Sequence, residues 1–88
     1  MHRILLIDDD EHLGPPLATY LRRFDLALQC ALRPSEGLAR LAAGGIDAVI
    51  LDVMLPEMDG FEVCRRIRQS SEVPVLMLTA RGDLTDRV

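Results

Sequence analysis

The sequence predicts an α/β fold in which a parallel sheet lies between two layers of helices. Short continuous apolar runs alternate with segments in which apolar residues recur at helical spacing. A short apolar run that ends in polar residues is typical of a strand buried on both faces of a parallel sheet. Strands that alternate with helices pair through right-handed crossovers, which place helices on both faces. The predicted strands are residues 3–7, 26–32, 48–51 and 73–78.

The first strand, residues 3–7, ends in acidic residues, and a helix is expected after it. The apolar side chains that would form the buried face of this helix are Leu17, Leu21 and Phe24. Pro15 and Pro16 lack backbone N–H groups and are tolerated only in the first turn of a helix. The helix is therefore expected to have a late or distorted start, near residues 12–16.

The second expected strand, residues 26–32, is assigned to an edge of the sheet, because polar Gln29 interrupts its apolar character. The next helix covers residues 35–43, which are rich in alanine and leucine. Gly44 and Gly45 then supply a helix stop.

The third strand, residues 48–51, ends in Asp52, and a loop closed by Pro56 and Gly60 follows it. A third helix is expected next, capped by Asp59. The apolar residues that mark this helix are Phe61, Cys64 and Ile67. The fourth strand, residues 73–78, leads into Thr79 and Ala80, and residues 83–88 are expected to begin a fourth helix.

Length and composition indicate one domain over residues 1–88. No apolar run approaches the ~20 residues that a membrane span requires. The net charge of −4 disfavours direct nucleic-acid binding by this segment, which depends on clustered basic residues. The acidic beginning of the chain is unlike a signal peptide, so a cytoplasmic location is expected. Cys30 and Cys64 lie in apolar segments and are expected to be packing residues.

Polar residues that could carry chemistry follow three of the predicted strands. Ligands of parallel sheets bind beyond the carboxyl ends of the strands, where Asp8, Asp9, Asp52 and Thr79 are expected to meet. Carboxylates brought together repel one another unless a cation neutralises them, and an all-oxygen ligand set suits Mg²⁺. With such a metal, an ionised aspartate can act as the nucleophile that forms an aspartyl phosphate. The Thr79 hydroxyl could then donate to a phosphoryl oxygen.

Three segments together resemble the receiver domains of two-component response regulators. They are Ile-Leu-Leu-Ile-Asp-Asp-Asp at 4–10, Val-Ile-Leu-Asp-Val-Met-Leu-Pro-Glu-Met-Asp-Gly at 49–60 and Pro-Val-Leu-Met-Leu-Thr-Ala at 74–80. The motifs occur in the order that this family has, each at the expected strand end. The resemblance implies a flavodoxin-like sheet with strand order 2-1-3-4.

The same resemblance implies a role for individual residues. Asp52 matches the aspartate that a sensor histidine kinase phosphorylates. The implied Mg²⁺ ligands are Asp8, Asp9, Asp52 and the backbone carbonyl of Met54. Thr79 and Ala80 match the switch and phosphate-binding positions. The chain would then be a signalling domain that switches an output domain, with a transcriptional output expected, and not an enzyme beyond self-catalysed phosphotransfer and dephosphorylation.

The chain departs from the family pattern at its end. Receivers carry a fifth strand with a phosphate-pairing lysine, then a final helix, whereas this sequence contains no lysine and stops earlier. It therefore resembles the N-terminal part of a receiver. An unpaired fourth strand would be an open sheet edge, so self-association through that edge is expected.

Two other classes of protein fit part of the sequence. A receiver-like docking module would have this fold without phosphorylation, and the missing lysine favours it. A haloacid-dehalogenase-type phosphatase would use Asp8 as nucleophile, since Asp8-x-Asp10 follows a strand. That interpretation leaves Asp52 and its loop without a role. Replacement of Asp8 or Asp52 by Asn separates the phosphatase from the receiver.

Overall fold

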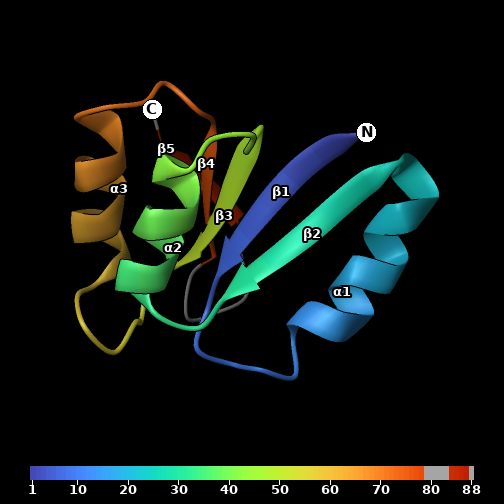
Figure 1. Cartoon of the computed structure of the whole chain (residues 1–88). Helices are drawn as coiled ribbons and strands as arrows, with labels where there is room; N and C mark the ends of the chain where they lie inside the picture. The colour runs from blue at the N-terminus through green and yellow to red at the C-terminus, as the bar shows by residue number, and fades with distance from the viewer. Residues whose placement is uncertain (79–83, 88) are drawn as a thin grey trace.

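The computed structural model describes residues 1–78 in full and, of residues 84–87, the backbone only. Four parallel strands form a sheet with the order β2-β1-β3-β4, and a fifth strand, β5, completes the edge next to β4. This arrangement confirms the predicted α/β fold and strand order (Figure 1). The elements are β1 (His2–Ile7), α1 (Gly14–Leu21), the 3-10 turn η1 (Arg22–Phe24), β2 (Leu26–Ala31), α2 (Pro34–Ala42), β3 (Ala48–Asp52), α3 (Gly60–Arg68), β4 (Val75–Leu78) and β5 (Leu84–Arg87).

The helices lie on two faces of the sheet, as the alternation of side chains along β1 shows. Leu6 pairs with Cys30 of β2 and therefore shares its face, and a Cβ atom built on Gly14 of α1 would lie 2.5 Å from the Cys30 sulfur. Ile7 points to the opposite face. A Cβ atom on Gly37 of α2 would lie 2.4 Å from Ile7 Cδ1. Hence α1 covers one face, while α2 covers the other together with α3 (Figure 1).

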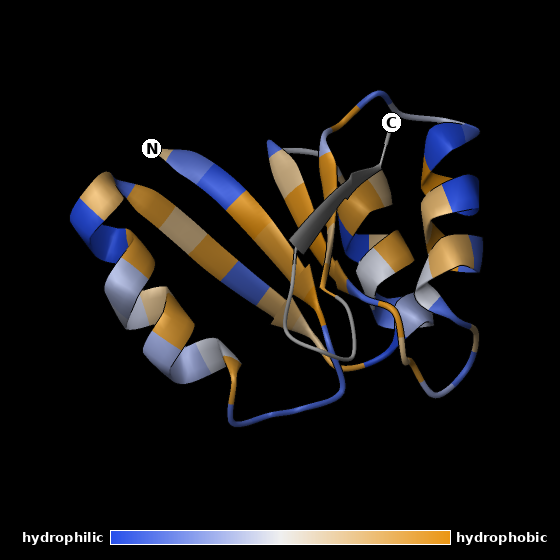
Figure 2. Ribbon diagram, turned by 180° about the vertical axis from the view of Figure 1, so that it is seen from behind, coloured by the Kyte–Doolittle hydropathy of each residue, from blue (hydrophilic) through white to orange (hydrophobic). Residues whose placement is uncertain are grey.

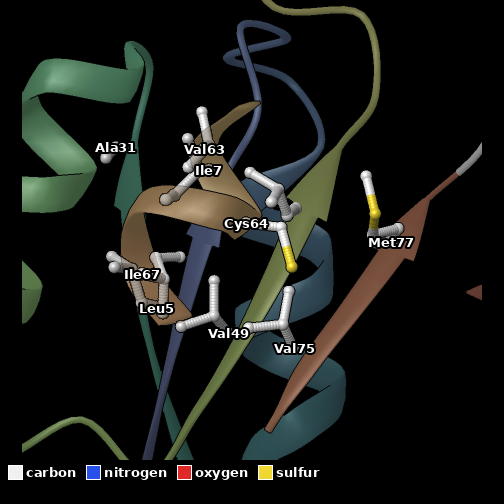
Figure 3. Packing of buried hydrophobic residues seen from close by; sticks show 10 residues of the cluster. Leu5, Ile7, Ala31, Val49, Val63, Cys64, Ile67, Val75 and Met77 are labelled. Carbon is white, nitrogen blue, oxygen red and sulfur yellow. The ribbon is translucent and has the colours of Figure 1, made fainter. Parts of the chain in front are cut away.

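The hydrophobic core lies between the sheet and the α2/α3 layer. Alternate residues of β1, β3 and β4 point into it and are fully or almost fully buried, and the inner side of α3 closes it (Figure 3). Figure 2 shows the apolar residues concentrated along the strands. The core residues are Leu5, Ile7, Ala31, Val49, Leu51, Val63, Cys64, Ile67, Val75 and Met77.

Most element boundaries agree with the sequence predictions. α1 begins at Gly14 with prolines in its first turn, and β2 lies at a sheet edge. The prediction that Phe24 lies on the buried face of this helix was wrong. The chain tightens into η1 after Leu21, which leaves Phe24 58% exposed, with its ring beside that of Tyr20. α2 ends at Ala42, and two glycines with positive φ follow.

Within the described residues, no helix is long and apolar enough to cross a lipid bilayer.

The C-terminal segment differs from the prediction. Residues 84–87, which were expected to begin a helix, form β5 and pair antiparallel with β4, Leu76 opposite Asp86. A strand at this place satisfies the outer backbone groups of β4, which a helix could not do. The predicted unpaired β4 edge is therefore also wrong, and it no longer provides a reason to expect self-association.

Candidate metal and phosphoacceptor site

The parallel pairing of β1 with β3 brings two acidic residues to the same edge of the sheet. Ile7 lies opposite Leu51, so Asp8 and Asp52, the next residue of each chain segment, are neighbours. Carboxylate oxygens of Asp8, Asp9 and Asp52 all lie within 4.8 Å of one another. Asp8 and Asp9 are the first residues of the hydrophilic loop from β1 to α1, which is blue in Figure 2. The structure thus brings the three predicted acidic residues together.

Backbone hydrogen bonds fix two of the three carboxylates. The Asp10 N–H donates to Asp8 Oδ1 over 2.9 Å, and the Met54 N–H donates to Asp52 Oδ1 over 3.1 Å. The Asp8 N–H donates in turn to the Ala31 carbonyl at the end of β2. These bonds hold the side chains in place before any ligand arrives, which reduces the entropy cost of binding one.

The three acids differ in their contact with solvent. Asp8 is 6% exposed, Asp52 is half-buried and Asp9 is exposed. Burial raises the pKa of Asp8, and the nearby charges of Asp52 and Asp9 raise it further, against the lowering effect of the Asp10 N–H. A buried carboxylate among other carboxylates is electrostatically unfavourable as an anion. The cluster is therefore a place that favours either a proton or a cation.

The donor set fits a magnesium ion. In an octahedral shell with bonds of about 2.1 Å, ligand atoms lie roughly 3 to 4.2 Å apart. Oxygens within 4.8 Å of one another need only small side-chain rotations to reach this spacing. All three donors are carboxylate oxygens, the type of ligand that hard cations prefer.

The β3–α3 loop, residues 53–59, closes tightly beside Asp52. The Gly60 N–H donates to the Val53 carbonyl over 2.8 Å. A Cβ atom at residue 60 would lie 2.4 Å from the backbone oxygen of Asp52, so only glycine fits there. Asp59 accepts the Glu62 N–H over 2.8 Å, which confirms it as the cap of α3.

Sequence reasoning missed Glu57. Its carboxylate accepts two hydrogen bonds from Ser35 in the first turn of α2, from the backbone N–H over 2.9 Å and from the hydroxyl over 3.1 Å. Arg33 lies 4.0 Å away. These hydrogen bonds, foremost that of the backbone N–H, hold the pKa of Glu57 below its usual range. The available signal was that Arg33, the N-cap residue of α2, has no side chain that can accept a helix N–H.

The remaining predicted residues are placed as follows. Met54 lies directly after Val53 in the loop beside the cluster, and its side chain is 67% exposed. Thr79 and Ala80 lie outside the described residues. Cys30 and Cys64 are free thiols, and Cys64 is part of the core, in keeping with a packing role.

A comparison with protein families matches residues 4–88 to the response regulator receiver domain. The transcriptional regulatory protein AfsQ1 of Streptomyces coelicolor is 43% identical over 88 residues, which is 100% of this chain and 39% of that protein. The transcriptional regulatory protein TcrA of Mycobacterium tuberculosis is 45% identical over 87 residues, 98% of this chain and 34% of that protein. The chain thus spans well under half the length of these relatives.

Solved structures give the same result. The response regulator TrrA of Thermotoga maritima, in complex with Mg²⁺ and a BeF group, superposes with a TM-score of 0.84 and 32% identity over 91% of this chain and 70% of that chain. A structure of the histidine kinase ThkA in complex with TrrA gives a TM-score of 0.86 and 31% identity, over 94% of this chain and 72% of the matched chain.

Proposed function

Because the chain belongs to the response regulator receiver domain family, we propose that Asp52 accepts a phosphoryl group from a sensor histidine kinase. Asp8, Asp9, Asp52 and the backbone carbonyl of Met54 would hold Mg²⁺. The observation that carries this proposal is the group of three carboxylates within 4.8 Å at the carboxyl ends of β1 and β3. The complex of TrrA with the kinase ThkA and the Mg²⁺–BeF complex of TrrA support it by similarity.

In the proposed reaction, an Asp52 carboxylate oxygen forms a bond to phosphorus while the bond from phosphorus to a kinase histidine nitrogen breaks. The electron pair leaves with the imidazole nitrogen, which takes up a proton. Asp52 is half-buried at the end of a strand, so its carboxylate is held in position and still within reach of a donor. Bound Mg²⁺ would neutralise charge on the phosphoryl oxygens.

The acidic neighbours have different tasks in this proposal. Buried Asp8 supplies negative charge that a proton or cation must compensate, and exposed Asp9 supplies a carboxylate on the solvent side. Thr79 and Ala80, by their family positions, would contact the phosphoryl group. A longer protein of the length of the relatives would carry a transcriptional output domain that this switch controls.

The two alternative functions receive less support. A phosphatase would need Asp8 as nucleophile, but its side chain is almost completely buried and hydrogen-bonded to the Asp10 N–H. A docking module without phosphorylation would have no need for three converging carboxylates. The receiver function uses all three.

The proposal is tested by incubation with Mg²⁺ and acetyl phosphate or phosphoramidate, followed by measurement of the intact mass. We expect the native chain to gain one acid-labile phosphoryl group, and Asp52→Asn to gain none. Labelling that persists in Asp52→Asn but disappears in Asp8→Asn would support the phosphatase instead. A folded native chain that gains no mass would show that this segment is not a phosphoacceptor by itself.

A further inference from the structure

The centre of the β3–α3 loop is connected to the rest of the molecule through Glu57. At one end of the loop, the Val53 N–H donates to the Leu78 carbonyl of β4, and at the other end Asp59 caps α3. Between these ends, the Met54 N–H donates to Asp52 of the adjoining strand β3. Within the described residues, the hydrogen bonds from this part of the loop to elements other than β3 and α3 are those that Glu57 accepts from Ser35. The apolar side chains of Leu55 and Met58 are partly buried against the core.

The link joins two segments that are far apart in sequence. Ser35 is the second residue of α2, where a helix has backbone N–H groups without internal partners. The side chain of the N-cap residue Arg33 cannot accept a hydrogen bond, so Glu57 supplies the missing side-chain acceptor from the loop. A carboxylate is also favoured at a helix N-terminus by the helix dipole. These hydrogen bonds therefore stabilise the first turn of α2 and, at the same time, hold Glu57 of the loop at one position on that helix.

The position of the loop determines where the Met54 carbonyl lies. Met54 precedes Glu57 by three residues, and its N–H is already bound to Asp52. Magnesium requires nearly ideal octahedral geometry, so a ligand that is displaced by a fraction of an ångström binds it less well. We propose that Glu57 is a positioning residue, which fixes the Met54 carbonyl for metal binding by anchoring the loop to Ser35 at the N-terminus of α2. This inference rests on the proposed function.

Four variants separate positioning of the metal site from simple capping of α2. Glu57→Ala removes the link, and Glu57→Gln retains one acceptor oxygen without the charge. Ser35→Ala removes the hydroxyl donor and leaves the backbone N–H in place. Glu72→Ala is the matched control, because it removes another exposed acidic side chain, which lies in the loop between α3 and β4.

The experiment is an NMR titration of each folded variant with Mg²⁺, together with amide hydrogen exchange of the metal-free protein. We expect Glu57→Ala to weaken Mg²⁺ binding about tenfold, at the lower end of the effect of losing a hydrogen bond that orients a ligand. In metal-free Glu57→Ala, the amide hydrogens of Met54 and Ser35 should exchange faster than they do in the metal-free native chain. Glu57→Gln and Ser35→Ala should show smaller losses in the same direction, and Glu72→Ala should bind Mg²⁺ like the native chain.

The contrary results are distinct. If Glu57→Ala accelerates exchange along α2 but leaves Mg²⁺ affinity unchanged, Glu57 only caps the helix and the inference is overturned, while the proposed function stands. If the native chain shows no Asp52-dependent Mg²⁺ binding, the proposed function fails and the inference fails with it. Should Glu57→Ala not fold, the inference would be overturned if Glu57→Gln and Ser35→Ala, which each weaken the link, both showed native Mg²⁺ affinity and native Met54 exchange.

Discussion

At the scale of single residues, the acidic cluster shows a conflict between stability and function. Asp8 is almost fully buried, and burial together with Asp52 and Asp9 raises its pKa. An anion in this position opposes folding, because the unfolded chain would hydrate it and separate it from the other carboxylates. The cluster is therefore a cost to the metal-free fold that a bound cation would relieve.

Asp8→Asn is expected to stabilise the chain in the absence of divalent metal. The Asn oxygen can still accept the Asp10 N–H, while one charge of the cluster is removed. The gain should be at least about 1 kcal/mol, the Coulomb energy of two unit charges 4 Å apart in water. Urea unfolding in EDTA at pH 7 measures it, with Glu72→Gln as control. In millimolar Mg²⁺ the free energy of unfolding of the native chain should rise by about the same amount, so that the two chains become similarly stable. An Asp8→Asn chain that is less stable in EDTA would contradict this account.

The clustering of these residues could be predicted from local sequence signals. Asp8 and Asp52 each follow a short apolar run, and the ends of neighbouring parallel strands meet at one edge. The site could not be predicted beyond that, because Glu57 reaches Ser35 across 22 positions of sequence. A hydrogen bond between a loop and the first turn of a distant helix leaves no periodic pattern. The exposure of Phe24 was missed for a similar reason, since a helix that tightens into a 3-10 turn rotates its last residues away from the expected face.

At the scale of elements, the helices differ in how their first turns are completed. α3 has its own cap in Asp59, which sequence analysis predicted because the bond spans three residues. α2 takes its acceptor from a distant loop. Glu62 in the first turn of α3 also forms ion pairs with Arg65 and, over 3.0 Å, with Arg66. The hydrogen bond from Arg66 is the main reason why the pKa of Glu62 lies below its usual range.

Glu62→Gln is expected to lower the thermal midpoint by a few degrees at most at pH 7, because these pairs are exposed to solvent. A carboxylate whose pKa is lower in the folded state stabilises the fold above its unfolded pKa, near 4.5, and this contribution disappears as the pH falls through the folded pKa. The difference between native and Glu62→Gln chains should therefore shrink below about pH 4.5. Thermal melts from pH 3 to 7 measure it, and a difference that grows on acidification would refute the assignment.

At the scale of the whole molecule, stability depends on the core that the described residues form between the sheet and the α2/α3 layer. A chain of 88 residues is expected to have a free energy of unfolding of roughly 0.05–0.15 kcal/mol per residue, about 4–13 kcal/mol in total. The apolar runs correctly predicted the buried strands that supply most of this core, since such runs are typical of strands covered on both faces. The antiparallel β5 was not predictable, because four residues carry too little pattern to distinguish a strand from the first turn of a helix.

Leu51→Ala tests the importance of this core. Leu51 is fully buried on β3, and truncation should cost roughly 2–5 kcal/mol, a large share of the total. Leu32→Ala is the matched control, since that side chain is 39% exposed and should cost much less. Urea denaturation followed by circular dichroism gives both values. Similar losses in the two variants would mean that the core is not where the structure places it.

The position of β1 in the sheet has a consequence for folding kinetics. β1 comes first in the chain but lies between β2 and β3, so one of its two partners is separated from it by α1, β2 and α2. Pairings between distant segments raise contact order and slow folding, because the chain loses the entropy of loop closure before the stabilising contacts form. The same pairing brings Asp8 next to Asp52. Electrostatic repulsion between the carboxylates therefore opposes folding at a step that chain entropy already makes slow, and a divalent ion that screens it would act as a folding accelerator.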